Sequence, residues 1–188
     1  MIYLCSTSPR RRALLKEKGI AYRLLKPRYH ETPIRSRSIT KGVKHHALGK
    51  ALSVTGLVPN GLILGADTVV VFQNKAVGKP RNMKHAHEIL TKLQGCTHSV
   101  VTAVALLKMK DSKIVKRAIF SVRSHVRLRK MGPSAIKDYF KRISPLDKAG
   151  AYAAQAVNAF PIVERITGSH SNVVGLPMEK LCDTMKQL

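Results

Sequence analysis

The most apolar segment of the chain carries one acidic residue in its middle. Residues 62–72 read Leu-Ile-Leu-Gly-Ala-Asp-Thr-Val-Val-Val-Phe, with β-branched side chains crowded into the second half. Such a run predicts a central strand that is buried on both faces. Removing the carboxylate of Asp67 from water is costly unless something compensates it. We therefore expect Asp67 to face a lysine, a metal ion or a water molecule that it deprotonates. The alternative is an acid satisfied by loop amides.

Apolar patterns on both sides of this segment predict strands mixed with helices. Helical spacing covers residues 9–18, 39–54, 83–93, 136–143 and 177–185, and strand-like runs cover 2–5, 21–25, 99–109, 114–128 and 161–166. Gly42 and Gly49 weigh against the second helix, because glycine is a poor helix former. Residues 26–38 are expected to form an irregular loop. The mixture predicts an α/β or α+β chain with a mixed sheet, and 188 residues suit one domain.

The charge of the chain raises a second class of function. Its 34 Lys+Arg and 10 Asp+Glu residues give a formal net charge of +24, which attracts polyanions. The predicted strand 114–128 would carry Arg123, His125 and Arg127 on a solvated face. However, the basic residues are spread along the chain, and five Tyr and four Phe without any Trp leave few base-stacking platforms. Nucleic-acid binding through a basic surface remains the alternative to catalysis.

Other sequence features bear on the location of the protein. No apolar run reaches the roughly 20 residues of a membrane helix, and no basic region precedes the short apolar start of the chain. Cys5, Cys96 and Cys182 are widely spaced and lack a CxxC pattern, which favours free thiols and the cytoplasm. The histidines, including the pair His45-His46, show no HExxH or comparable spacing, which argues against a zinc site.

The first predicted strand-to-helix transition gathers groups that suit a polyphosphate. Ser8 is the expected N-cap, and arginines fill positions 10–12 of the following turn. A helix N-terminus already carries positive partial charge, so these arginines are unfavourable there unless an anion binds. The hydroxyls of Ser6 and Ser8 and the forked guanidinium of Arg10 would suit a di- or triphosphate. The alternative is a solvated basic helix end, since no glycine-rich P-loop is present.

Four further residues are candidates for the same chemistry. Glu31, in a Glu-Thr-Pro turn, can join Asp67 in supplying oxygen ligands to Mg²⁺. Lys50, beside the apolar stripe of 39–54, and Lys79, in Gly-Lys-Pro, can neutralise phosphate oxygens. The amide of Gln155 can read a base edge. Each also has an ordinary interpretation. Glu31 can be an acid of a surface loop, and the two lysines can be ordinary basic residues. The loop that carries Gln155 can be a tight connection into the next predicted strand.

Taken together, these segments resemble the Maf family of nucleoside triphosphate pyrophosphatases, also known as septum-formation-inhibitor-like proteins. The resemblance runs almost end to end. The motifs that carry it, in order, are Leu-Cys-Ser-Thr-Ser-Pro-Arg-Arg at 4–11, Glu-Thr-Pro at 31–33, Gly-Ala-Asp-Thr-Val-Val at 65–70, Gly-Lys-Pro at 78–80, Asp-Lys-Ala-Gly-Ala-Tyr at 147–152 with Gln155, and Ser-Asn-Val-Val-Gly-Leu-Pro at 171–177. The resemblance implies one domain over residues 1–188. It also implies a fold like that of inosine triphosphate pyrophosphatases, in which helices flank a mixed twisted sheet and a cleft separates two lobes.

The resemblance also implies an activity. Family members are cytoplasmic enzymes that use a divalent metal, Mg²⁺ or Mn²⁺, to hydrolyse a nucleoside triphosphate to the monophosphate and pyrophosphate. Asp67 matches the family's proposed proton acceptor, and we assign it and Glu31 as metal ligands. The resemblance leaves the oligomeric state open, a homodimer included.

The remaining assignments concern the substrate. The phosphate contacts are assigned to Arg10, Lys50 and Lys79, together with the hydroxyls of Ser6 and Ser8. Arg10, Thr68 and Gln155 match positions that distinguish the branch acting on dTTP and UTP from a branch acting on a methylated guanine nucleotide. We therefore expect a pyrimidine nucleotide, with Thr68 and Gln155 near its base.

Four positions depart from the family pattern. His30 stands where an acid often precedes the glutamate, and His125 stands where an acid is usual. Cys96 replaces a common arginine, and Ala156 replaces a glycine after Gln155. These differences predict weaker metal binding, weaker phosphate contacts and a more crowded cleft.

Overall fold

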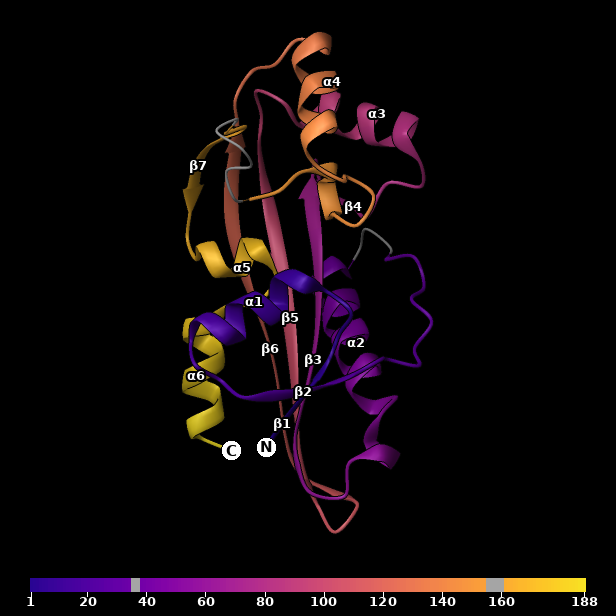
Figure 1. The fold of residues 1–188 in the computed structure, drawn as a ribbon, viewed down its shortest axis with the longest axis vertical. Coiled ribbons are helices and arrows are strands. Elements are labelled where there is room, and N and C mark those ends of the chain that lie inside the picture. Colours follow the sequence, from indigo (N-terminus) through magenta and orange to yellow (C-terminus); the bar gives the residue numbers. More distant parts are fainter. Residues whose placement is uncertain (35–37, 155–160) are drawn as a thin grey trace.

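The computed structural model describes residues 1–34, 38–154 and 161–188. Within these residues a seven-stranded mixed sheet forms the centre of the molecule (Figure 1), with the strand order β2-β1-β3-β5-β6-β7 and β4 paired with β3. The strands are β1 Ile2–Cys5, β2 Tyr22–Leu25, β3 Gly61–Phe72, β4 Lys75–Val77, β5 Thr97–Lys110, β6 Lys113–Leu128 and β7 Val163–Thr167. The expected α/β class with a mixed sheet is confirmed.

The helices cover both faces of this sheet. They are α1 Pro9–Glu17, α2 Ile39–Leu52, α3 Met83–Leu93, α4 Pro133–Arg142, α5 His170–Val174 and α6 Met178–Lys186. In Figure 1, α2 lies on one side of the long strands and α1 and α6 lie on the other, while α3 and α4 lie at the upper end. Each group of helices has its own buried apolar cluster against the sheet. The long strands β3, β5 and β6 extend from the part of the molecule that holds α1, α2 and α6 to the part that holds α3 and α4.

The expected elements are all present, with ends shifted by a few residues. The sequence did not predict β4 or α5, which have three and five residues, because neither is long enough to show a period. The solvated face expected along β6 holds only for residues 123–128, where exposed and buried residues alternate. Over 118–122 both faces are half-buried, because Ile119 packs against the core on the α2 side.

Strand β3 joins the parallel and antiparallel parts of the sheet. It pairs in parallel with β1 and antiparallel with β5, so that Asp67 lies opposite Ala103. On the other edge of β3, β1 pairs only as far as Gly65 and β4 only from Val70, so among the described residues the stretch around Asp67 is paired with β5 alone. As the apolar sequence predicts, β3 is buried over most of its length.

Two glycines let other segments approach α2 and β3 closely. A Cβ atom on Gly65 would overlap the backbone oxygen of Ala47 and come within 2.9 Å of the Ala51 side chain, so α2 lies directly on β3 at this point. A Cβ atom on Gly49 would overlap the ring of Tyr29. The close packing at Gly65 brings the buried face of α2 beside Asp67. The contact at Gly49 holds the 26–34 segment against the exposed side of the same helix.

In the described parts of the chain, Cys5, Cys96 and Cys182 are free thiols, as expected. No helix there combines the length and the apolar character that crossing a membrane requires.

Candidate active site

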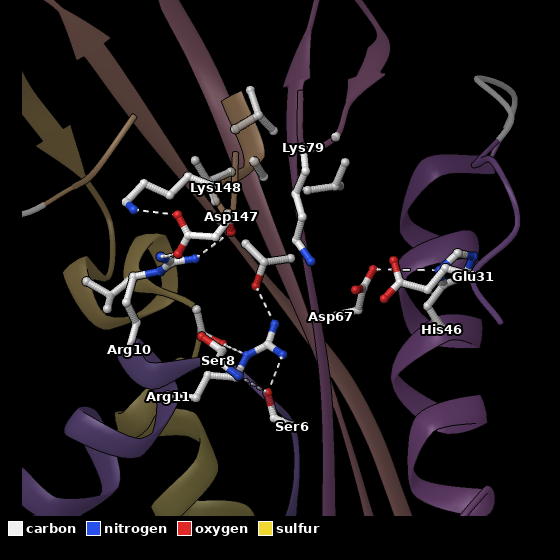
Figure 2. Close-up of a pocket in the computed structure, with 18 of the residues that line it drawn as sticks. Ser6, Ser8, Arg10, Arg11, Glu31, His46, Asp67, Lys79, Asp147 and Lys148 are labelled. Atoms are coloured by element: carbon white, nitrogen blue, oxygen red, sulfur yellow. Dashed lines mark hydrogen bonds and ion pairs between the residues drawn. The ribbon is translucent and has the colours of Figure 1, made fainter. Parts of the chain in front are cut away.

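A cleft of about 560 Å³ opens beside the middle of β3. Its lining comes from the start of α1, the 27–34 segment, α2, β3, the loop around Lys79, residues 147–154 and the turn at Gly175. Figure 2 shows two groups of charged residues facing each other across it. We call Glu31, His46, Lys50 and Asp67 the carboxylate wall, and Ser6, Ser8, Arg10, Arg11, Asp147 and Lys148 the arginine wall.

The partner of Asp67 in this structure is a lysine. Asp67 is 7% exposed, and the ammonium of Lys50 donates to its Oδ1 at 2.6 Å. The same ammonium lies 2.7 Å from Oε1 of Glu31. Of the possibilities left open by the sequence, the structure therefore shows the lysine. It also brings Glu31, Lys50 and Asp67 together from three separate segments, as the assignments require.

Lysine also controls the ionisation of Glu31. Burial raises the pKa of this carboxyl, but the hydrogen bond and the charge of Lys50 outweigh burial, with help from Lys79. The pKa of Glu31 consequently lies below its ordinary value, so the group is a carboxylate at neutral pH. The carboxylate wall thus carries two acids against one ammonium.

His46 belongs to this wall, although sequence reasoning set the histidines aside. Its side chain is buried, its Nδ1 atom lies 4.0 Å from Oδ2 of Asp67, and that nitrogen has no hydrogen-bond partner among the described residues. The available signal was helical spacing, because His46 lies four residues before Lys50 and so faces the same way. Motif spacing could not identify His46, because Glu31 and Asp67 come from different segments of the chain.

Glu31, His46 and Asp67 form a cluster that fits a metal ion. One ligand atom from each residue lies within 4.8 Å of the others. Two carboxylates and an unpartnered imidazole nitrogen are suitable donors for a divalent cation. The expected ligands Glu31 and Asp67 are therefore close enough to act together.

The arginine wall is built from residues far apart in the sequence. Arg10 donates to Oδ2 of Asp147 at 2.7 Å and to its backbone oxygen at 3.0 Å. Lys148 donates to the other carboxylate oxygen at 2.6 Å. Burial raises the pKa of Asp147, but Lys148 and Arg10 outweigh it and bring the pKa below its ordinary value. The two cations thus share one counter-ion at the edge of the cleft.

Arg11 corrects the interpretation of the arginine cluster. Sequence reasoning placed residues 10–12 together at an anion site, but the Arg11 side chain turns inward and is buried. Its guanidinium donates to backbone oxygens of Ala66 and Gly175 at 2.9 Å, to Thr68 at 3.0 Å and to Ser6 at 3.2 Å. Four acceptors therefore satisfy it without an anion, and it holds α1 against β3 and the turn after α5.

The remaining candidates among the described residues all line the cleft. The Ser6 hydroxyl accepts from the backbone of Ser8, and the Ser8 side chain makes no capping bond to the described helix. The Thr68 hydroxyl accepts from Arg11 and is 3.0 Å from that of Thr102. Lys79 is exposed, and its ammonium points into the cleft (Figure 2). Gln155 lies outside the described residues, so its expected role stays a prediction.

The departures from the family pattern fall in different places. His30 is exposed next to Glu31. His125 lies on β6 with Nδ1 3.3 Å from the hydroxyl of Ser99, and Cys96 precedes β5; neither lines the cleft. Ala156 lies outside the described residues. The predicted losses of metal and phosphate affinity are not tested by these positions.

Comparison with other proteins shows a close relationship over the whole chain. A dTTP/UTP pyrophosphatase of Gloeobacter violaceus is 41% identical over 99% of this chain and 95% of its own. Relatives with the same name from Dictyoglomus thermophilum and Clostridioides difficile are 38% and 34% identical, and the matches cover 95% and 94% of those proteins.

A solved nucleoside-triphosphatase / dITP/XTP pyrophosphatase of Mycobacterium abscessus matches 68% of this chain and 73% of its own, at 15% identity and a TM-score of 0.44. The model of the family described as Maf-like protein matches residues 1–188. This chain therefore belongs to the Maf family.

Proposed function

We propose that the protein hydrolyses a nucleoside triphosphate, dTTP or UTP, to the monophosphate and pyrophosphate. The observation that carries the proposal is the buried carboxylate of Asp67, held in a cleft whose opposite wall is cationic. The names of the relatives, dTTP/UTP pyrophosphatases at 34–41% identity, support the substrate class.

The proposed reaction is an attack by water on the α-phosphorus, with pyrophosphate as the leaving group. Asp67 takes the proton of the water: Lys50 occupies Oδ1, and Oδ2 makes only a 4.0 Å approach to His46. Such a base contributes typically 10²–10⁴-fold to the rate. Fixing the triphosphate across the cleft supplies the in-line geometry.

The phosphates would meet cations from both sides of the cleft. Arg10 and Lys79 are exposed enough to bind phosphate oxygens, and Ser8 lines the cleft at the start of α1. Lys50 is held between two carboxylates, so its assigned phosphate contact requires the ammonium to shift from one of them. These cations would stabilise the charge that develops on the leaving pyrophosphate.

Glu31 and Asp67 are the proposed metal ligands. A divalent ion bound to them would polarise phosphate oxygens and offset their negative charge. The identity of this ion, Mg²⁺ or Mn²⁺, belongs to the proposal. For base recognition we propose Gln155 and Thr68, of which Thr68 lines the cleft.

The cellular setting is also proposed. Free thiols support a cytoplasmic enzyme, and a homodimer remains a prediction. The alternative of a nucleic-acid-binding protein is not favoured, since the relatives are named for hydrolysis of nucleotides. Exposed Arg123, His125 and Arg127 on β6 would allow a salt-sensitive attraction of polyanions.

The proposal is tested by measuring pyrophosphate release. The purified protein is incubated with dTTP, UTP and GTP in the presence of Mg²⁺ or Mn²⁺. We expect release from dTTP and UTP, and a loss of about 10²–10⁴-fold in Asp67→Asn, which keeps the side-chain shape. Asp183→Asn, on the exposed side of α6, is the matched control and should keep full activity. Absence of release from every nucleotide, or equal activity in Asp67→Asn, would overturn the proposal.

A further inference from the structure

We propose that His46 is a third, nitrogen-donating ligand of the metal site, so that this site prefers a first-row transition ion such as Mn²⁺ or Co²⁺ to Mg²⁺. The inference rests on the proposed function only in placing the ion between Glu31 and Asp67. It adds a residue with no role in the hydrolysis described above, and it predicts which ion the site selects.

The geometry is the first argument. His46 is 4% exposed, its Nδ1 lies 4.0 Å from Oδ2 of Asp67, and one donor atom from each of Glu31, His46 and Asp67 lies within 4.8 Å of the others. An octahedral ion with bonds of about 2.1 Å has neighbouring donors about 3 Å apart and opposite donors about 4 Å apart. The three separations would have to shorten by at most about 2 Å to bring the atoms onto one ion.

The unpartnered nitrogen is the second argument. A buried polar atom without a hydrogen bond costs roughly 1–3 kcal/mol, so such atoms need an explanation. Among the described residues, Nδ1 of His46 has no hydrogen-bond partner. In Figure 2 the ring lies beside the Glu31 carboxylate, on the side of the cleft that carries Asp67. A metal ion at this place would accept the lone pair that the protein leaves unused.

The surrounding residues hold the ring in this position. α2 lies directly on β3 at Gly65, which fixes the helix turn that carries His46. On its other side, the ring of Tyr29 meets the ring of His46 edge to face, with centroids 5.7 Å apart. Packing on both sides therefore holds the imidazole beside Asp67, and only the contraction given above separates it from a ligand position.

Charge and donor type decide the preferred ion. Two carboxylates facing one ammonium leave an excess negative charge, which favours a divalent cation that shares these oxygens with Lys50 or displaces its ammonium. Mg²⁺ prefers oxygen ligands and keeps several waters, whereas imidazole suits transition ions. Adding a nitrogen to two carboxylates thus raises the affinity for Mn²⁺ or Co²⁺ more than that for Mg²⁺.

The direct test uses pulsed electron paramagnetic resonance on the full chain loaded with Mn²⁺ and without nucleotide. A histidine ligand should give nitrogen modulation that changes when histidine alone is labelled with ¹⁵N. The signal should disappear in His46→Leu and persist in His45→Leu, an exposed neighbour on the same helix. No histidine nitrogen signal, or one unchanged in His46→Leu, would overturn the inference.

A second measurement compares affinities by titrating metal-free protein with Co²⁺ and with Mg²⁺. We expect His46→Leu and the polar variant His46→Gln to weaken Co²⁺ binding about tenfold or more and to change Mg²⁺ binding less than about threefold. Equal losses for both ions, or none, would show an ordinary buried histidine or a His46–Asp67 ion pair. If the protein releases pyrophosphate but His46→Leu leaves the Co²⁺ affinity unchanged, only this inference is refuted. If the protein shows the histidine nitrogen signal but releases no pyrophosphate, only the proposed function is refuted.

Discussion

The two walls of the cleft hold their charges in different ways. On the carboxylate wall, the Lys50 and Asp67 side chains are each 10% exposed and come from elements that pack tightly together. On the arginine wall, the Arg10 and Asp147 side chains are 26% and 46% exposed. Exposed ion pairs contribute little stability, so Arg10 can exchange Asp147 for a phosphate at small cost. The Lys50–Asp67 pair is fixed by folding, whereas the Arg10–Asp147 pair is free to change partners.

The same contrast separates two adjacent arginines. Arg10 meets a carboxylate at the surface, whereas Arg11 is buried and donates to four acceptors, none of them an acid. Burial lowers the pKa of Arg11, and the charge of Asp67 acts in the opposite direction. One arginine is therefore available to a substrate, and its neighbour is part of the framework that holds α1 in place.

The largest effect is expected from removing the cation of the carboxylate wall. Lys50→Met leaves Glu31 and Asp67 facing each other, and an uncompensated buried charge costs about 3–5 kcal/mol. Urea unfolding without metal measures this loss, and Lys41→Met, exposed on the same helix, should change stability by less than about 0.5 kcal/mol. A loss below about 1 kcal/mol in Lys50→Met would mean that this wall is not fixed by its ion pairs.

A smaller loss of stability should separate the two arginines. Arg11→Lys keeps the charge but cannot reach four acceptors, so we expect a loss of about 2–3 kcal/mol in unfolding free energy. Arg10→Lys should lose less than about 1 kcal/mol, because its pair is exposed. Instead, its KM for dTTP should rise by about tenfold, since a lysine cannot make the forked contact to phosphate. Equal stability losses in the two variants would contradict the assignment.

The next effect concerns the contact that brings the carboxylate wall together. Gly65→Ala places a Cβ atom against the Ala47 backbone oxygen, so α2 must move away from β3. Overpacking of this kind costs about 1–3 kcal/mol, and the shift should also reduce kcat by separating Lys50 from Asp67. Gly56→Ala is the matched control, because nothing lies within 4 Å of its added Cβ atom. Full activity in Gly65→Ala would show that the spacing of helix and strand is not critical.

These glycines also show what the sequence could and could not predict. The apolar patterns predicted the strands of the sheet and the long helices, because periodicity reports which face is buried. Gly42 and Gly49 weighed against a helix that exists. Their cost is offset by packing, since Ile34 and Tyr29 lie where side chains would stand. Single-segment patterns carry no information about such contacts between segments.

The sequence predicted those parts of the site in which a charged residue interrupts an apolar segment or lies near one. Asp67 drew attention because an acid in an apolar strand needs a partner, and Lys50 and Glu31 lie beside it. His46 and Arg11 were missed for opposite reasons. His46 sits on a helix whose buried residues are mostly apolar, and the acids near it come from other segments. Arg11 is surrounded by basic residues in the sequence, and only the folded chain shows that it points inward.

The smallest effect should come from the exposed carboxylates, one on each wall. Glu31 and Asp147 have pKa values below their ordinary values of 4.5 and 3.8, because their lysine and arginine partners outweigh burial. Each therefore binds a proton more weakly in the folded chain than in the unfolded one. Their stabilisation is complete above the ordinary values and is lost as the pH falls through the lower folded values.

Each group should contribute only a few tenths of a kcal/mol, because the side chains are 47% and 46% exposed. Urea unfolding from about pH 6 to about pH 2.5 measures the contribution as the acid-side slope of stability. Glu31→Gln should flatten this slope more than Asp147→Asn does. The reason lies in the partners: Lys50 is 10% exposed, whereas Arg10 is 26% exposed and more strongly screened by water. A larger effect of Asp147→Asn would mean that the arginine wall is the more tightly held of the two.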